Sequence, residues 1–128
     1  MSHFSKIKTK IVDKALLLET IEALGYTVIP DRKLVKGFKG EESKADICIS
    51  IPHESYEIGF SASKNGYQII ADWWGFRKFD QQLFHDQLIQ KYAHLAAVKK
   101  LTEQGFVVAK EIINENGEIQ LVLRRVNP

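Results

Sequence analysis

The chain has 128 residues, 45% of them hydrophobic and 27% charged, which is the size and composition of one folded domain. This composition excludes an intrinsically disordered chain, a collagen-like repeat and a coiled coil. The formal net charge of +2 is too small to argue for nucleic-acid binding.

The N-terminal segment predicts a strand followed by a helix. Uncharged residues alternate through residues 4–11 with three lysines, Lys6, Lys8 and Lys10. This period of two is typical of a strand with one face in water. Asp13 can cap the helix that follows, and Gly25 suits its C-terminal end. The apolar stripe of this helix consists of Leu17, Ile21 and Leu24.

The middle of the chain is rich in predicted strands. We expect them at residues 26–29, 46–51, 56–62 and 67–73. Residues 31–45 are polar and contain glycines, so they are expected to form loops around a short strand. Pro30 and Pro52 each end a strand, and Asn65-Gly66 favours a two-residue type I′ hairpin turn.

The C-terminal part predicts a long helix and a hairpin. Asp80 can cap a helix over roughly residues 80–104, which Gly105 ends. Its apolar stripe consists of Phe84, Leu88, Tyr92, Leu95 and Val98. Strands over residues 106–113 and 119–123 follow, joined by a turn at Asn116-Gly117. Together the elements predict one α+β domain over residues 1–128, with a mainly antiparallel sheet of about six or seven strands and both helices packed on one face.

The sequence contains no complete catalytic or metal-binding motif. His85 and His94 are nine positions apart on the long helix and face opposite ways, so we expect no metal site. Phosphate-binding loops and a nucleophile elbow are absent. The lone Cys48 fits a small packing residue. We therefore expect no cofactor and no catalytic residue, and Gly37–Gly40, which matches the loop of a KH domain without its flanking helices, is expected to be a turn.

The densest local signal is the run Asp72-Trp73-Trp74-Gly75-Phe76-Arg77. Consecutive tryptophans on a strand point to opposite faces, so one can enter the core while the other stays outside. An exposed tryptophan beside Arg77 is typical of a protein-contact anchor and can also stack on a planar ligand. The alternative is that both rings, Trp73 and Trp74, belong to the core.

Two charged features leave functional and structural interpretations open. Asp72, at the end of a strand, can form an ion pair with Arg77 or Lys78, or can line a catalytic cleft together with Arg77 and His85. The stripe of Lys6, Lys8 and Lys10 can contact phosphates, as in an RNA or anion binder. Lysines also protect an edge strand from pairing with other chains.

Seven segments resemble a known family: residues 1–7, 35–40, 45–47, 56–60, 71–75, 104–108 and 121–125. The chain resembles the conserved hypothetical reading frame numbered thirty-five of plastid genomes and cyanobacteria, a domain of unknown function. The resemblance implies a place in the chloroplast stroma or the cyanobacterial cytoplasm. It also implies an assembly or adaptor role linked to an AAA-type ATPase or a ferredoxin, since relatives are sometimes encoded near such proteins.

The resembling segments concentrate in two places: the turn that holds Phe38 and Lys39, and the strand end at residues 72–75. We expect these two places to form one surface.

The chain has no apolar run long enough to cross a bilayer, and its N-terminus lacks the apolar core of a signal peptide. Our leading hypothesis is a non-catalytic adaptor that binds a protein partner, without membrane or nucleic acid. The alternatives are a small-ligand binder or enzyme with a cleft at the sheet end, and a weak RNA or anion binder.

Overall fold

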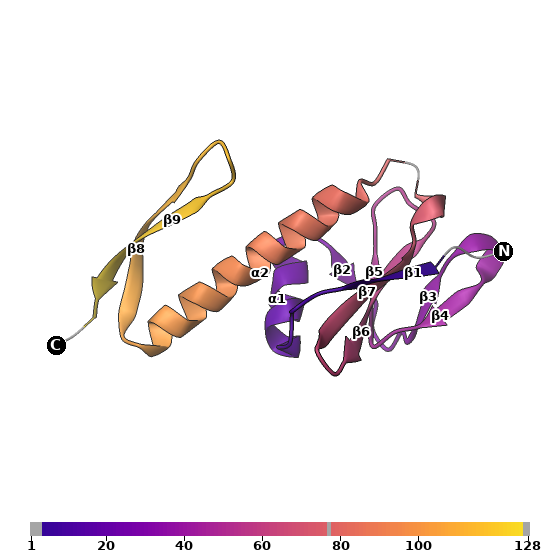
Figure 1. The fold of residues 1–128 in the computed structure, drawn as a ribbon, viewed down its shortest axis with the longest axis horizontal. Coiled ribbons are helices and arrows are strands. Elements are labelled where there is room, and N and C mark those ends of the chain that lie inside the picture. The colour runs from indigo at the N-terminus through magenta and orange to yellow at the C-terminus, as the bar shows by residue number, and fades with distance from the viewer. Residues whose placement is uncertain (1–3, 77, 127–128) are drawn as a thin grey trace.

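The computed structural model describes residues 4–76 and 78–126, apart from the side chain of Phe38 (Figure 1). Its main sheet has five antiparallel strands in the order β1-β7-β6-β5-β2. These strands are β1 (Phe4–Lys8), β2 (Thr27–Val28), β5 (Ile47–Ser50), β6 (Glu57–Ser63) and β7 (Gly66–Asp72). Because β1 pairs only with β7 in the described part of the chain, it forms one edge of the sheet.

The β6–β7 hairpin differs from the prediction by one residue. Ser63 pairs with Gly66, so Lys64 and Asn65 form the turn and Gly66 begins β7. Gly66 has a φ of +136°, and a Cβ there would come within 2.5 Å of the carbonyl oxygen of Thr9. Glycine at this position therefore allows the chain leaving β1 to approach the hairpin closely.

Both helices cover the same face of the main sheet, as predicted. They are α1 (Lys14–Ala23) and α2 (Gln81–Glu103). Each begins at its predicted cap: Asp13 accepts a hydrogen bond from the backbone N–H of Leu16 (3.1 Å), and Asp80 accepts one from Leu83 (3.0 Å). The helices and the sheet share one apolar core, built around the buried side chains of Leu17, Ile21, Ile49, Ile58, Phe60, Ile69, Phe84 and Leu88.

A short hairpin packs on the opposite face of the sheet. It consists of β3 (Leu34–Lys36) and β4 (Glu42–Lys44), joined by the 3₁₀ turn η1 (Phe38–Gly40). Its Val35 is buried with Cys48 of β5 in a second, smaller core. A Cβ on Gly59 of β6 would overlap the side chain of Val35 and come within 2.7 Å of Ala45, so this glycine makes room for the hairpin.

The last hairpin, β8 (Phe106–Ile113) and β9 (Ile119–Arg125), forms a sheet of its own. Helix α2 has 23 residues and is about 35 Å long. Its first half lies on the main sheet, and its second half carries the hairpin beyond the sheet (Figure 1). The α+β class and the shared helix face are thus confirmed. The main sheet has five strands rather than six or seven because β3–β4 and β8–β9 pair separately.

Candidate binding surface at the end of the main sheet

The two tryptophans lie in a turn rather than in a strand. Strand β7 ends at Asp72, and residues 73–75 form the 3₁₀ turn η2 (Trp73–Gly75). Trp73 packs against the main core, whereas the side chain of Trp74 is 78% exposed. The prediction that the strand includes Trp73 was wrong. The sequence left open whether one ring or both belong to the core, and in the structure only Trp73 packs there.

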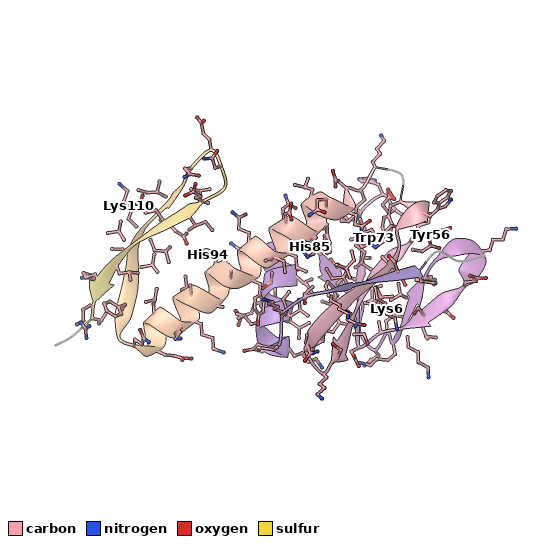
Figure 2. The ribbon with its side chains drawn as sticks, viewed as in Figure 1. Lys6, Tyr56, Trp73, His85, His94 and Lys110 are labelled. Atoms are coloured by element: carbon pink, nitrogen blue, oxygen red, sulfur yellow. The ribbon has the colours of Figure 1, made fainter. Side chains whose placement is uncertain are left out.

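An aromatic cluster holds Trp73 in place. The ring of Phe79 lies parallel to that of Trp73 at 6.4 Å between centroids, and the rings of Phe76 and Phe84 lie at 5.5 and 6.4 Å. Figure 2 shows Trp73 and Tyr56 at this end of the sheet, and the ring of Phe76 packs against both. Such pairs add to the stabilisation from burial alone, so the turn that exposes Trp74 is fixed by the packing of its neighbours.

The turn after β3 joins the same end of the sheet. A Cβ on Gly37 would come within 2.6 Å of the ring of Phe4 and 3.0 Å of both Cβ and Oδ2 of Asp72. Gly37 therefore lies against Asp72, and both residues are buried. That the exposed parts of the segments at residues 37–40 and 72–75 form one surface stays a prediction. Lys39 is exposed and adopts a left-handed φ of 50°; the side chain of Phe38 lies outside the described residues.

Asp72 is fully buried beside Gly37. It follows Ala71, which packs into the core under the helices, so its side chain points to the opposite face of the sheet. His85 belongs to α2, which covers the Ala71 face. The structure therefore does not bring Asp72 and His85 together in one cleft. Arg77, the third residue of that predicted arrangement and the expected ion-pair partner of Asp72, lies outside the described residues.

A hollow of about 550 Å³ borders the aromatic cluster. The described residues that line it are Pro52, His53, Glu54, Lys78 and Phe79. The carboxylate of Glu54 accepts a hydrogen bond from the backbone N–H of Lys78 (3.2 Å), which links the two loops that form its walls. A cleft at the sheet end was one predicted alternative. The structure places a hollow there, and its described lining contains neither Asp72 nor His85. We call the residues 37–40, 52–56 and η2 the sheet-end surface.

The described part of the chain offers few side chains for nucleophilic catalysis or metal binding. Within it, no group of three or more His, Cys, Asp or Glu side chains is placed to hold a metal ion. Cys48 is fully buried, and burial raises the pKa of its thiol, an effect that the negative charge of Glu57 increases. The residue points away from Ile47 and Ile49, as the alternation predicted, and packs in the smaller core.

The three lysines of the N-terminal stripe are exposed. Lys6 and Lys8 lie on β1, and Lys10 lies beyond its end, because the strand stops at Lys8 rather than at residue 11. Thr9 still donates its backbone N–H to the carbonyl of Tyr67 (3.1 Å). The stripe therefore lies along a sheet edge, where lysines discourage pairing with other chains. A role in binding anions stays a prediction.

Tyr56 and Phe79 were not among the site residues predicted from the sequence, and Phe76 was included only as part of the run at residues 72–77. Tyr56 packs edge-on against Phe76, with centroids 6.2 Å apart and an interplanar angle of 86°. A signal was present for the others, since Trp73, Phe76 and Phe79 recur every three residues, which is typical of one side of a 3₁₀ or helical turn. No local pattern marks Tyr56, because its partner Gly75 is distant in the sequence.

Comparison with known proteins identifies the family. The family described as "Protein of unknown function (DUF1257)" matches residues 20–122. The chain belongs to this family. The match runs from α1 into β9 and includes the whole sheet-end surface of this DUF1257 chain.

Curated relatives cover the full length of this DUF1257 chain. It is 35% identical to the uncharacterized protein ycf35 of Guillardia theta, over 100% of both chains. It is 33% identical to ycf35 of Pyropia yezoensis, over 99% of both, and 29% identical to ycf35 of Cyanophora paradoxa, over 98% of both. These relatives confirm the resemblance drawn from the sequence. No solved structure matches the chain. Among the described residues, no helix is long and apolar enough to cross a membrane.

Proposed function

We propose that this DUF1257 protein is a non-catalytic adaptor that binds a protein partner through the sheet-end surface, with Trp74 as the central contact. The observation that carries the proposal is the 78% exposure of Trp74 on a turn whose other aromatic residues are packed. Tryptophan is enriched among the residues that dominate the energy of protein interfaces. A large ring held outside a fixed turn is ready to enter a partner's pocket with little loss of conformational entropy.

The surroundings of Trp74 support a protein ligand. The turn at residues 37–40 packs against the strand end through Gly37 and the buried Asp72, which favours a surface built from more than one loop. Charged side chains border it, among them Lys39, Glu54 and Lys78, which suits the polar rim of an interface. The relatives come from algae, and we place the protein in a plastid stroma or a cyanobacterial cytoplasm. An AAA-type ATPase and a ferredoxin-linked protein are the first partners to look for.

The test is affinity capture from a soluble extract of the source cells, comparing the wild type with two variants. Trp74→Ala removes the proposed contact, and Val12→Ala is the matched control, because Val12 is 71% exposed outside this surface. Partners retained by the wild type and Val12→Ala at moderate salt, and lost by a folded Trp74→Ala, support the proposal. A folded Trp74→Ala that captures the same proteins in the same amounts contradicts it.

A second candidate function is the binding of a small molecule in the hollow at the sheet end. The hollow of about 550 Å³ combines the ring of Phe79 with the charged groups of Glu54 and Lys78, the mixture of apolar wall and few polar groups found in ligand sites. A thermal-shift screen of metabolites tests it, with Lys78→Ala as the variant. A ligand that raises the melting temperature of the wild type but not of Lys78→Ala supports this function.

If the affinity capture described above recovers RNA, the binding of that RNA should weaken steeply with salt.

A further inference from the structure

The C-terminal hairpin lies apart from the rest of the strands. Strands β8 and β9 pair only with each other in the described part of the chain, and the hairpin lies beyond the main sheet at the far end of α2 (Figure 1). An isolated two-stranded hairpin is at best marginally stable in water, and three or more strands with an apolar face are needed for independent stability. The hairpin therefore needs support from elsewhere.

Helix α2 supplies only part of this support. The side chain of Gln90 donates a hydrogen bond to the carbonyl of Gly117, and the ring of His94 contacts the carboxylate of Glu111. Figure 2 shows His94 on the side of α2 that faces the hairpin. Between these contacts lies a hollow of about 380 Å³ lined by alanines of the helix and by Ile119 and Leu121 of β9. The helix thus holds the hairpin at a few points without filling the space beneath it.

The hairpin and the residue after it, Val126, also carry most of the exposed large hydrophobic residues of the described chain. Of ten large hydrophobic residues that are exposed there, six lie between residues 107 and 126: Val107, Ile112, Ile113, Val122, Leu123 and Val126. Ile113 and Leu123 lie on the face with Glu111, toward α2, whereas Val107, Ile112 and Val122 lie on the other face. Clustered apolar residues on both faces of one small element are typical of a surface that another chain covers.

The accessible surface area of the chain is larger than that of a compact monomer of the same mass, as expected for a subunit that binds a partner. The chain exposes 8615 Å², whereas a compact monomer of 14.6 kDa exposes about 6,900 Å². The excess is about 1,700 Å². Stable homodimers bury about 1,000–2,500 Å² on each subunit. The excess area falls within the range that one subunit of a stable homodimer buries.

Strand β9 provides the regular edge for such pairing. Strand β8 is interrupted by an irregularity between Val108 and Lys110, which twists its edge. Strand β9 has seven residues without proline or glycine, and it is unbroken. A long, regular and apolar edge is a template for pairing with another chain.

We propose that a second copy of this chain pairs along β9, so that two hairpins form one four-stranded antiparallel sheet about a two-fold axis. Antiparallel pairing of all seven residues centres the axis on Val122. This register places Leu121 of one copy opposite Leu123 of the other. It also places Arg124 opposite Gln120 and Arg125 opposite Ile119, so no like charges face each other. The interface is isologous and closes, as in most homodimers.

The first experiment measures the molar mass of the full chain in solution by light scattering after size exclusion. The wild type is expected at twice 14.6 kDa. Val122→Lys places two lysines together on the axis and should raise the dissociation constant on the order of a hundredfold. Ile112→Lys is the matched control, because Ile112 lies on the same face with similar exposure, 39% against 43%, but on the outer strand. It should remain a dimer.

The outcomes separate the proposal from its competitors. A monomeric wild type at tens of micromolar overturns the proposal. A dimer that Ile112→Lys breaks and Val122→Lys keeps also overturns it, since pairing would then use another edge. Circular dichroism checks that both variants are folded, and both positions are already partly exposed, so lysine fits them.

A cross-link gives a second measurement that does not depend on lysine being tolerated. Residues on the axis of an antiparallel pair have Cα atoms about 4.5–5.5 Å apart, within the range of a disulfide. Val122→Cys should therefore form a covalent dimer on oxidation, whereas Ile112→Cys should not. The native Cys48 is fully buried and stays out of the reaction. Equal cross-linking of both variants, or of neither, contradicts the β9 pairing.

Discussion

The ring of Tyr56 lies directly over the α-carbon of Gly75. A Cβ built on Gly75 would overlap the ring atoms Cε2 and Cδ2 of Tyr56. Tyr56 precedes β6 and Gly75 ends η2, so this contact joins two loops that are distant in the sequence. It sets the course of the turn that exposes Trp74, because the turn can lie flat against the ring only where no side chain intervenes.

Gly75→Ala should therefore destabilise the protein. The added methyl group must displace the ring of Tyr56, and such overpacking typically lowers the free energy of unfolding by about 1–3 kcal/mol. Urea denaturation measures the loss. The control is the same change in a Tyr56→Ala background, where space is available and the added cost should be smaller. Additive costs in this double-mutant cycle would show that the two residues are not coupled.

Substitution of the two tryptophans by alanine should change the stability of the protein to very different extents. Trp73→Ala removes a ring from the aromatic cluster and should cost about 3 kcal/mol of stability. Trp74→Ala removes a ring that is 78% exposed and should change stability by less than about 0.5 kcal/mol. Thermal and urea denaturation measure both. A large loss of stability in Trp74→Ala would mean that this ring is structural, and the adaptor proposal would lose its main support.

The helices were predictable because their signals are local. Asp13 and Asp80 cap their own helices, and Gly25 and Gly105 follow the helix ends with φ of +89°. Capping requires only a side chain that reaches a backbone N–H three residues away, so the sequence alone suffices to place it. The final hairpin was predictable for the same reason, but its turn lies one residue earlier than predicted. Gly117 donates its backbone N–H to the carbonyl of Asn114 (3.0 Å), so Glu115 and Asn116 form the centre of the turn.

The grouping of the strands into separate sheets and the shape of the site were not predictable, because both depend on contacts between residues that are far apart in the sequence. Strand β1 pairs with β7, which lies some sixty residues further along the chain. No feature of the sequence around Lys6 indicates that Ile70 is its partner. The β3–β4 hairpin packs on the sheet because Gly59, far away in sequence, lacks a side chain. Likewise the turn that follows Asp72 packs its Gly75 against Tyr56, which lies far away in sequence. The alternation before Trp73 continues the strand pattern and gives no sign of this turn.

The thiol of Cys48 should react slowly in the folded protein. The side chain is fully buried, and burial raises the pKa of the thiol, so little thiolate forms at pH 8 and reagent cannot reach it. The rate of reaction with a chromogenic disulfide measures this, and urea should restore the rate of an ordinary free cysteine. Rapid reaction without denaturant would mean that the hairpin β3–β4 opens readily from the sheet.

Asp13 should make the stability of α1 depend on pH in the acid range. The backbone N–H of Leu16 donates to its carboxylate and, with the nearby Lys99, holds the pKa of Asp13 below its ordinary value. Protons therefore bind more tightly to Asp13 in the unfolded chain than in the folded one. Its stabilisation is complete above the ordinary carboxyl pKa and is lost as the pH falls through the lowered pKa.

Asp13→Asn separates this effect from that of the other carboxylates. Asparagine caps helices about as well as aspartate but does not titrate. Urea denaturation between pH 2 and pH 6 should show a shallower fall in stability for Asp13→Asn than for the wild type, with the difference confined to the acid end. The variant keeps Glu19 and Glu22, the acidic residues within α1, so the comparison isolates the cap. Parallel pH profiles for the two proteins would mean that Asp13 titrates equally in the folded and unfolded chains.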